Sequence, residues 1–363
     1  MFPFCFGIPP GAIVLQNTCA IIFDVVFYKR EERILNCTKN FRQTLIVFAF
    51  LVFVSVQAVW AAALPSWSDT ADKQAIITFV TAVTDKNSPQ YIAPIDRIAV
   101  FDNDGTIIPE KPYSFIDMFA MLQAKKLHSS EAEWKNDAWA QKLFNCTPAE
   151  FDDIRQTMPA EEFGKIFAAG NGGQSQDQVD QALHEYVYTN TMHPKYKKPP
   201  AQLLYKPMVE LITYLKANGF TVYLSSGSTT DYLRQFSESS AGISKSNVIG
   251  WDYRDEVKYD TNGKLYLYKT TDLVAPAPLN EGKPINIYRH VGRRPVFAFG
   301  NSSGDLEMLT YTRQNTLPSL CLILNHDDGV REYAYDFGQK VWDAAKAQKW
   351  IVVRMKEDFA TIY

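Results

Sequence analysis

Hydrophobic positions divide the chain into alternating strand-like and helix-like segments. Short apolar runs predict buried strands at 97–101, 221–224, 295–299, 319–324 and 350–354. Between them, apolar residues recur at helical spacing, as over 72–83 and 206–218. Strands that alternate with helices are typical of a parallel sheet covered on both faces, so we expect a doubly wound, Rossmann-like α/β core.

Two segments depart from this alternation. The stretch 112–200 has a helical pattern throughout, which predicts a helical cap inserted after the first core strand. Two alternating runs flank Asn262-Gly263, a pair that favours a small β-hairpin excursion with a two-residue turn. The expected organisation is an N-terminal extension at 1–63, an α/β core at 64–111 and 201–363, and a cap at 112–200.

The front of the chain has the pattern of an export signal. Residues 44–64 carry no charge, Lys39 and Arg42 stand just before them, and small residues end the stretch at A-x-A spacing. We expect a secretory signal peptide cleaved after Ala63, which predicts a periplasmic or secreted protein. An uncleaved membrane anchor is the alternative, because about 20 apolar residues can span a bilayer.

Residues 1–35 do not fit a signal of ordinary length. Their apolar stretch is broken by Pro9, Pro10 and Asp24, so they predict either a second membrane segment or a true start downstream at a non-AUG codon. We favour the downstream start and leave the segment out of the fold expectations.

Composition excludes some classes of function. The net charge of −3 offers no basic excess for nucleic acid, so we expect no nucleic-acid partner and membrane contact only through the front segment. The five cysteines include no CxxC pair, which argues against a thiolate metal site and a disulfide framework.

Polar clusters follow several predicted strands, at the sheet edge where open α/β folds place their sites. The first, Asp102-Asn103-Asp104-Gly105-Thr106, comes directly after the first core strand. Two carboxylates two residues apart can face one cavity, where one attacks phosphorus and the other protonates the leaving alcohol. Gly105 permits the tight turn that this loop needs.

The second cluster is Ser225-Ser226-Gly227, at the end of the strand predicted at 221–224. A serine there can donate to a phosphate oxygen beside backbone N–H groups, although such a serine more often only caps a helix. We choose Ser226 as the phosphate contact because Gly227 follows it directly.

Two further features complete the set. Lys283 can neutralise a phosphate and a carboxylate nucleophile, although Lys258 and Lys269 compete for this role. After the strand at 295–299, the loop that contains Asn301 and Asp305 offers oxygen ligands, which Mg²⁺ prefers.

The order DxDGT, then Ser-Gly, then Lys, then Gly-Asn-x-x-Gly-Asp resembles the four motifs of the haloacid dehalogenase superfamily, most closely a phosphoserine-phosphatase-like group, over nearly all of 64–363. The resemblance implies that Asp102 is a nucleophile forming an aspartyl-phosphate and Asp104 the general acid and then base. It also implies phosphate contacts from Thr106, Ser226, Gly227 and Lys283, and Mg²⁺ held by Asp102, the Asp104 carbonyl, Asn301 and Asp305.

The loop departs from the family pattern in one respect. Asn301 stands where many relatives carry an acid, so Asp305 would supply the anionic contribution to the metal. Which of these two residues is the main metal ligand of the loop stays open.

Within the superfamily, the residue at the position of Asp104 distinguishes one type of reaction from another. Dehalogenases need no acid there and P-type pumps carry threonine, so Asp104 favours phosphate-ester hydrolysis or phosphomutase action. Of these we expect a Mg²⁺-dependent phosphomonoester hydrolase acting on a small phosphorylated substrate. A phosphomutase and an inactive binding protein with this fold are the alternatives. Export favours the phosphatase.

Two other groups have ordinary explanations that we prefer. His326-Asp327-Asp328 could be a metal cluster, but we expect an acid that caps a helix running through Tyr333. Aromatic residues of the insertion could line a pocket, but we expect them to form the small core of the cap: Tyr113, Phe115, Phe119, Trp134, Trp139 and Phe144.

Overall fold

The computed structural model describes residues 63–363, so the predicted signal or anchor and the predictions for residues 1–35 lie outside the described residues. Within 63–363, no helix is both long and apolar enough to cross a membrane.

A six-stranded parallel sheet forms the core, in the order β4-β3-β1-β7-β8-β9. Its strands are β1 (Ile98–Phe101), β3 (Thr221–Thr229), β4 (Val248–Trp251), β7 (Phe297–Gly300), β8 (Leu320–Asn325) and β9 (Ile351–Arg354). The chain builds outward from β1 through β3 to β4 on one side and from β7 to β9 on the other. The strand order therefore reverses between β1 and β7, which opens a crevice at their carboxyl ends. The expected doubly wound α/β core is confirmed.

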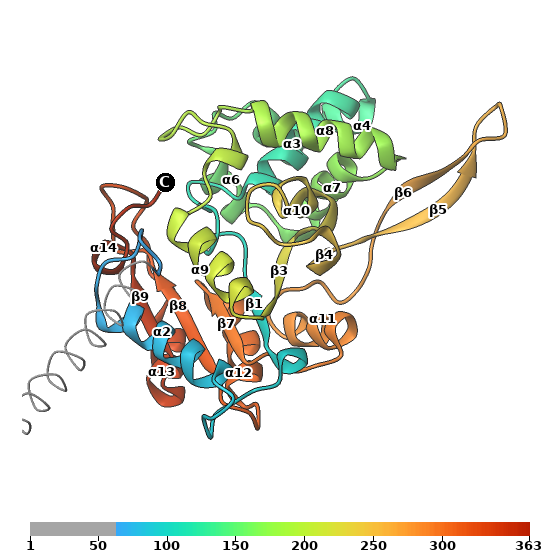
Figure 1. Ribbon diagram of the computed structural model, residues 1–363. Coiled ribbons are helices and arrows are strands. Elements are labelled where there is room, and N and C mark those ends of the chain that lie inside the picture. The colour runs from blue at the N-terminus through green and yellow to red at the C-terminus, as the bar shows by residue number, and fades with distance from the viewer. Residues whose placement is uncertain (1–62) are drawn as a thin grey trace, which may run out of the picture. The chain divides into compact units, whose positions relative to one another are not determined.

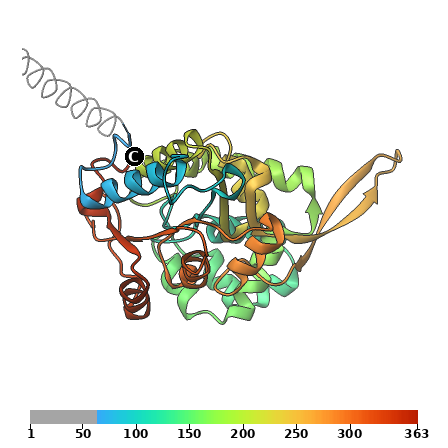
Figure 2. The same ribbon diagram turned by 60° about the horizontal axis from the view of Figure 1, so that its bottom comes forward.

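Helices cover both faces of this sheet (Figures 1 and 2). Val100, Ala298 and Ile323 belong to a buried cluster with residues of α11 (Gly282–Val291), α12 (Leu306–Arg313) and α13 (Gln339–Gln348). On the other face, Phe297 contacts Phe79 of α2 (Ala71–Thr84) at a ring distance of 6.3 Å. Apolar side chains alternate to both faces, which is why each strand is a continuous apolar run.

Six helices lie in the insertion between Phe115 and Thr189, and Figure 1 draws most of them above the sheet. They are α3 (Phe115–His128), α4 (Ala132–Asn136), α5 (Ala138–Phe144), α6 (Phe151–Thr157), α7 (Ala160–Asn171) and α8 (Gln176–Thr189). Two more helices flank β3: α9 (Lys206–Ala217) precedes it and α10 (Thr230–Phe236) follows. A short helix, α14 (Met355–Asp358), follows β9.

A second, antiparallel sheet has the order β2-β6-β5, formed by β2 (Gln174–Ser175), β5 (Tyr253–Tyr259) and β6 (Leu265–Leu273). The β5–β6 hairpin, called the arm below, projects from the body in both views (Figures 1 and 2).

The predicted two-residue turn of this hairpin is wrong. Asp260 accepts from the Gly263 N–H and donates its own N–H to the Lys264 carbonyl, both at 3.0 Å, so three residues form the loop. Gly263 has a φ of 75°, while Asn262 stays outside the left-handed region that a type I′ turn requires of both central residues. A glycine bulge after an ordinary turn is the next common solution.

Candidate active site

Asp102 lies at the reversal point of the sheet, directly after β1. Its N–H donates to the Phe299 carbonyl of β7 at 2.9 Å, which fixes the chain as it leaves the strand. The following turn brings Gly105 against the β7 loop with a φ of 75°. A Cβ at Gly105 would lie 1.9 Å from Nδ2 of Asn301, so only glycine fits both the backbone angle and the space.

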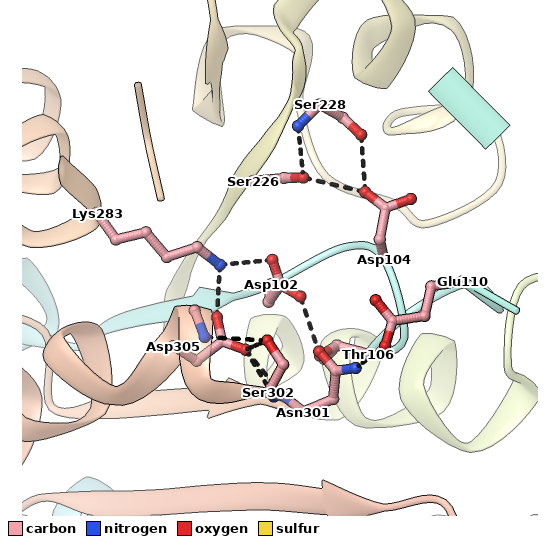
Figure 3. A network of polar contacts seen from close by, with 11 residues as sticks. Asp102, Asp104, Thr106, Glu110, Ser226, Ser228, Lys283, Asn301, Ser302 and Asp305 are labelled. Carbon is pink, nitrogen blue, oxygen red and sulfur yellow. Dashed lines mark hydrogen bonds and ion pairs between the residues drawn. The ribbon is translucent and has the colours of Figure 1, made fainter. Parts of the chain in front are cut away.

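Lys283 extends from the start of α11 to the side chain of Asp102 (Figure 3). Its Nζ lies 2.5 Å from Oδ1 of Asp102 and 2.5 Å from Oδ1 of Asp305, and the side chain is 2% exposed. Burial alone would lower the pKa of Lys283, but the two carboxylates raise it above its ordinary value, so the lysine is a cation. Lys269 pairs with acids of α10 and β5, and Lys258 lies on the arm. Of the three candidate lysines, Lys283 is the one beside Asp102.

The carboxylate of Asp102 has an unfavourable environment for its charge. Burial raises the pKa of Asp102 well above its ordinary value, the neighbouring Asp305 adds to the rise, and Lys283 opposes it. An ionised carboxylate at this position therefore depends on positive charge beside it.

Asp104 is held by hydroxyl groups. Its Oδ2 accepts from Ser228 at 2.7 Å and from Ser226 at 3.3 Å, and its Oδ1 accepts from Ser114 at 3.4 Å. Ser225, the other candidate in this cluster, is buried and its hydroxyl has no hydrogen-bond partner within the described part of the chain.

Ser228 is a residue that the sequence reasoning missed. The strand was expected to end at 224, but β3 continues to Thr229 with a shift in its pairing to β4 after Ser225. This extension carries Ser228 to Asp104. A run of three hydroxyl residues after Gly227 was the available signal.

The β7 loop is organised around Asp305. Its Oδ2 accepts the backbone N–H groups of Asn301 at 2.9 Å and Ser302 at 3.1 Å, while Oδ1 accepts from Lys283. A Cβ at Gly300 would lie 2.4 Å from Cγ of Asp305, so glycine allows the carboxylate to fold back on the loop. Both carboxylate oxygens of Asp305 are engaged within the protein.

The amide of Asn301 has a defined orientation. Its Nδ2 donates to Oε1 of Glu110 at 2.9 Å and to the Tyr335 hydroxyl at 3.3 Å. Its Oδ1 accepts from Oγ1 of Thr106 at 3.3 Å, and that hydroxyl lies 3.4 Å from Oδ2 of Asp102. The amide oxygen therefore faces the Asp102 side of the loop (Figure 3).

Glu110 is the second functional candidate missed from the sequence, because an acid in a short loop carries no distinguishing pattern. Burial raises its pKa to about 7, although the Tyr335 hydroxyl opposes the rise. The carboxyl group accepts only from the nitrogen end of the Asn301 amide, which leaves the amide oxygen on the side of Thr106 and Asp102.

The oxygens present are compatible with a hard cation. Among residues 63–363, no three His, Cys, Asp or Glu side chains gather as a metal site, so a metal here would draw on amide or backbone oxygens as well. Oδ2 of Asp102 and Oδ1 of Asn301 both lie near the Thr106 hydroxyl, at 3.4 and 3.3 Å. Carboxylate and carbonyl oxygens are the ligands that Mg²⁺ prefers.

A cavity of about 410 Å³ opens beside Asp102 and Asp104. The core contributes Ser226, Gly227, Lys283 and Ser302, and the helical insertion contributes Asp117, Arg155, Phe163 and Phe167. The six aromatic residues singled out from the sequence do not line it. Four of them, Tyr113, Phe115, Phe119 and Phe144, are buried, which agrees with a core role.

The predicted helix through Tyr333 is wrong. Residues 327–334 form a turn that returns antiparallel, with the Tyr335 N–H donating to the His326 carbonyl at 2.9 Å. Asp328 still accepts backbone N–H groups, as a capping acid would, but it does so within the turn. The physical reason is His326, which is buried and lies with Nε2 2.7 Å from the Gly105 carbonyl, so tertiary contacts fix this segment.

The fold and site together define an α/β protein with an acid pair, a buried lysine and an Asn/Asp loop at the point where a parallel sheet reverses its strand order. No family model matches the chain, and no curated protein matches it in sequence.

Solved structures with a similar fold are known. One is a protein of unknown function from Anaerococcus prevotii, with 15% identity, a TM-score of 0.49, and 80% of this chain and 92% of that chain covered. Another is a protein of unknown function from Bordetella pertussis, with 16% identity, a TM-score of 0.44, and 71% and 97% covered. A third is a phosphoserine phosphohydrolase-like protein from Francisella tularensis, with 14% identity, a TM-score of 0.38, and 72% and 97% covered. At these identities the likeness concerns the fold alone.

Proposed function

We propose that this chain is a Mg²⁺-dependent phosphohydrolase that cleaves small phosphomonoesters through an aspartyl-phosphate on Asp102. One observation carries the proposal: Lys283 lies 2.5 Å from the Asp102 carboxylate at the wall of a cavity that Asp104 also lines. A buried carboxylate with a cation at one oxygen and a second acid nearby suits nucleophilic attack on an anionic ester.

The chemistry divides into two steps. In the first, a carboxylate oxygen of Asp102 forms a bond to phosphorus, the ester bond breaks, and Asp104 gives its proton to the leaving alcohol. In the second, Asp104 takes a proton from water as the water attacks phosphorus, and the bond to Asp102 breaks to release phosphate. The hydroxyls of Ser226 and Thr106 and the backbone at Gly227 would contact the phosphoryl oxygens.

The metal would be held by Asp102, Asn301 and the backbone carbonyl of Asp104. When bound, Mg²⁺ reduces repulsion between the nucleophile and the ester and stabilises charge on the transferring group. Between Asn301 and Asp305, the oriented amide oxygen supports Asn301 as the ligand, because Asp305 is occupied by Lys283 and the loop N–H groups. Asp305 would then act by positioning Lys283.

The helices at 112–200 would form the cap over a core made of 64–111 and 201–363. Insertion side chains such as Arg155 and Phe163 line the cavity, and its volume of about 410 Å³ supports a small substrate. With a signal cleaved near Ala63, the enzyme would work in the periplasm or outside the cell, and an anchored form would be its alternative.

Hydrolysis of p-nitrophenyl phosphate by the purified full-length chain tests the proposal. We expect turnover that requires Mg²⁺ and falls at least about a thousandfold in Asp102→Asn. Equal turnover by wild type and Asp102→Asn would contradict the nucleophile. Absence of turnover by the wild type would favour the inactive binding protein, and transfer of the phosphoryl group to a sugar hydroxyl instead of water would favour the mutase.

A further inference from the structure

The arm presents a free strand edge. In the order β2-β6-β5, strand β5 is outermost, and the arm projects from the body (Figures 1 and 2). The Asp260 N–H donates inward to the carbonyl of Lys264, the residue just before β6. Because this direction alternates along a strand, the backbone groups of Asp255, Val257 and Tyr259 point outward, away from β6. Edges of this kind are templates for pairing with another strand.

One face of the arm is apolar and exposed. Val257 stands opposite Leu267, and Tyr259 stands opposite Leu265. These four side chains are 58%, 42%, 65% and 51% exposed, respectively. A two-stranded ribbon is marginally stable by itself, and exposed apolar surface next to a free edge is typical of an interaction site.

The order of charges along β5 and its end favours a second copy of the same strand as the partner. Glu256 and Lys258 flank Val257, and beyond them lie Arg254 and Asp260 with signs that continue the alternation. If a second β5 pairs antiparallel about Val257, each Glu256 stands opposite a Lys258 and each Arg254 opposite an Asp260. Registers centred one residue away would place Glu256 opposite Glu256, or Lys258 opposite Lys258. Like charges directly opposite are destabilising.

The register centred on Val257 also gives hydrogen-bond partners to the outward-facing backbone groups of β5. It pairs Val257 with its copy and Asp255 with Tyr259, and these are the residues whose N–H and C=O groups point outward. We propose that two copies of this chain form a homodimer in which the β5 strands pair antiparallel about Val257, joining their β2-β6-β5 sheets into one. The apolar faces of the two arms then become one continuous strip. The assembly does not depend on the proposed activity.

Charge exchange tests the proposal with full-length protein. Glu256→Lys places lysine opposite lysine in its own dimer, and Lys258→Glu places glutamate opposite glutamate. A heterodimer of the two variants has an acid–base pair at both positions. By sedimentation, we expect the wild type to be a dimer. Each single variant should dissociate into monomers at concentrations at least about tenfold higher than those at which the wild type dissociates. The equimolar mixture of the two variants should be dimeric again.

A cross-link supplies an independent measurement. With a short bis-maleimide, Val257→Cys should give a covalent dimer above the wild-type background. Thr261→Cys is the matched control, because the two tips would lie about 26 Å apart, eight residues of extended strand. A monomeric wild type, variants that dimerise as wild type does, a mixture that stays monomeric, or equal cross-linking at 257 and 261 would each overturn the proposal.

Discussion

At the scale of single residues, the carboxylate of Asp104 owes its position to the hydroxyls around it. The contact of 2.7 Å from Ser228 is shorter than the contact of 3.3 Å from Ser226, which we expect to turn to the phosphoryl group. Ser228→Ala should therefore lower kcat about tenfold with a smaller change in KM, because the acid is no longer held toward the leaving oxygen. Ser225→Ala is the matched control, since its buried hydroxyl has no partner in the described chain. Equal losses in the two variants would contradict the positioning role.

Glu110 would act on the proposed metal site through Asn301. Replacing its carboxylate with an apolar side chain removes the acceptor that directs Nδ2 outward, so the amide can rotate. Glu110→Leu should raise the half-saturating Mg²⁺ concentration about tenfold, with less effect on kcat at saturating metal. Glu110→Gln keeps an acceptor oxygen and should stay near wild type. A Mg²⁺ titration of activity measures both, and an unchanged requirement in Glu110→Leu would exclude this role.

The site residues that belong to a local sequence motif could be predicted from the sequence. The structure brings Asp102, Asp104, Ser226 and Lys283 together, as their places after predicted strands suggested. Glu110 and Ser228 were missed because each matters through a contact made only in three dimensions.

At the scale of elements, the turn after β1 depends on Gly105. Alanine there meets both a left-handed backbone and the Asn301 side chain, whereas Gly173 has a φ of 74° with nothing within 4 Å of a Cβ. Gly173→Ala should destabilise by about 1–2 kcal/mol, the cost of the backbone angle alone. Gly105→Ala should lose about 1–3 kcal/mol more because of crowding. Urea unfolding of both variants measures the difference, and equal losses would exclude the close packing.

The periodicity of the sequence predicted five of the six core strands and the helices α2 and α9, but it missed β4 and failed in two turns. Buried strands need only a continuous apolar run, and the five predicted ones are present within a few residues. The segment after β8 is fixed by His326 reaching Gly105, and the arm's turn by one glycine bulge. Neither contact leaves a periodic signal.

At the scale of the whole molecule, two acidic residues near opposite ends of the described chain lie side by side. Burial raises the pKa of Asp72 in α2 to about 6, and the nearby Asp358 of α14 adds to the rise. The unfolded carboxyl titrates near about 3.9. Between about pH 4 and 6 the folded state holds the proton more tightly, so the stability from this group is full below that window and is lost as pH rises through it.

Asp72→Asn should remove this dependence. The variant should match wild type near pH 4 and be more stable by on the order of 1–2 kcal/mol at pH 7. Urea unfolding at a series of pH values measures the free-energy difference. A difference that does not change between pH 4 and 7 would contradict the raised pKa of Asp72.

The parallel sheet could be predicted from the alternation of strands and helices in the sequence. The proposed dimer could not be predicted from that alternation. The register of β5 with a second copy rests on the charges of the strand together with the direction of its backbone groups, and that direction follows from the arm's hydrogen bonds.

The central claim is that Asp102 takes up the phosphoryl group. p-Nitrophenol leaves readily without protonation, so Asp104→Asn should still transfer phosphate from p-nitrophenyl phosphate to Asp102 but lack the base for the second step. Rapid-quench kinetics should show a burst of about one nitrophenol per active site, and borohydride reduction followed by mass spectrometry should place the modified residue at 102. A burst without modification, or a modification at any other residue, would contradict the account.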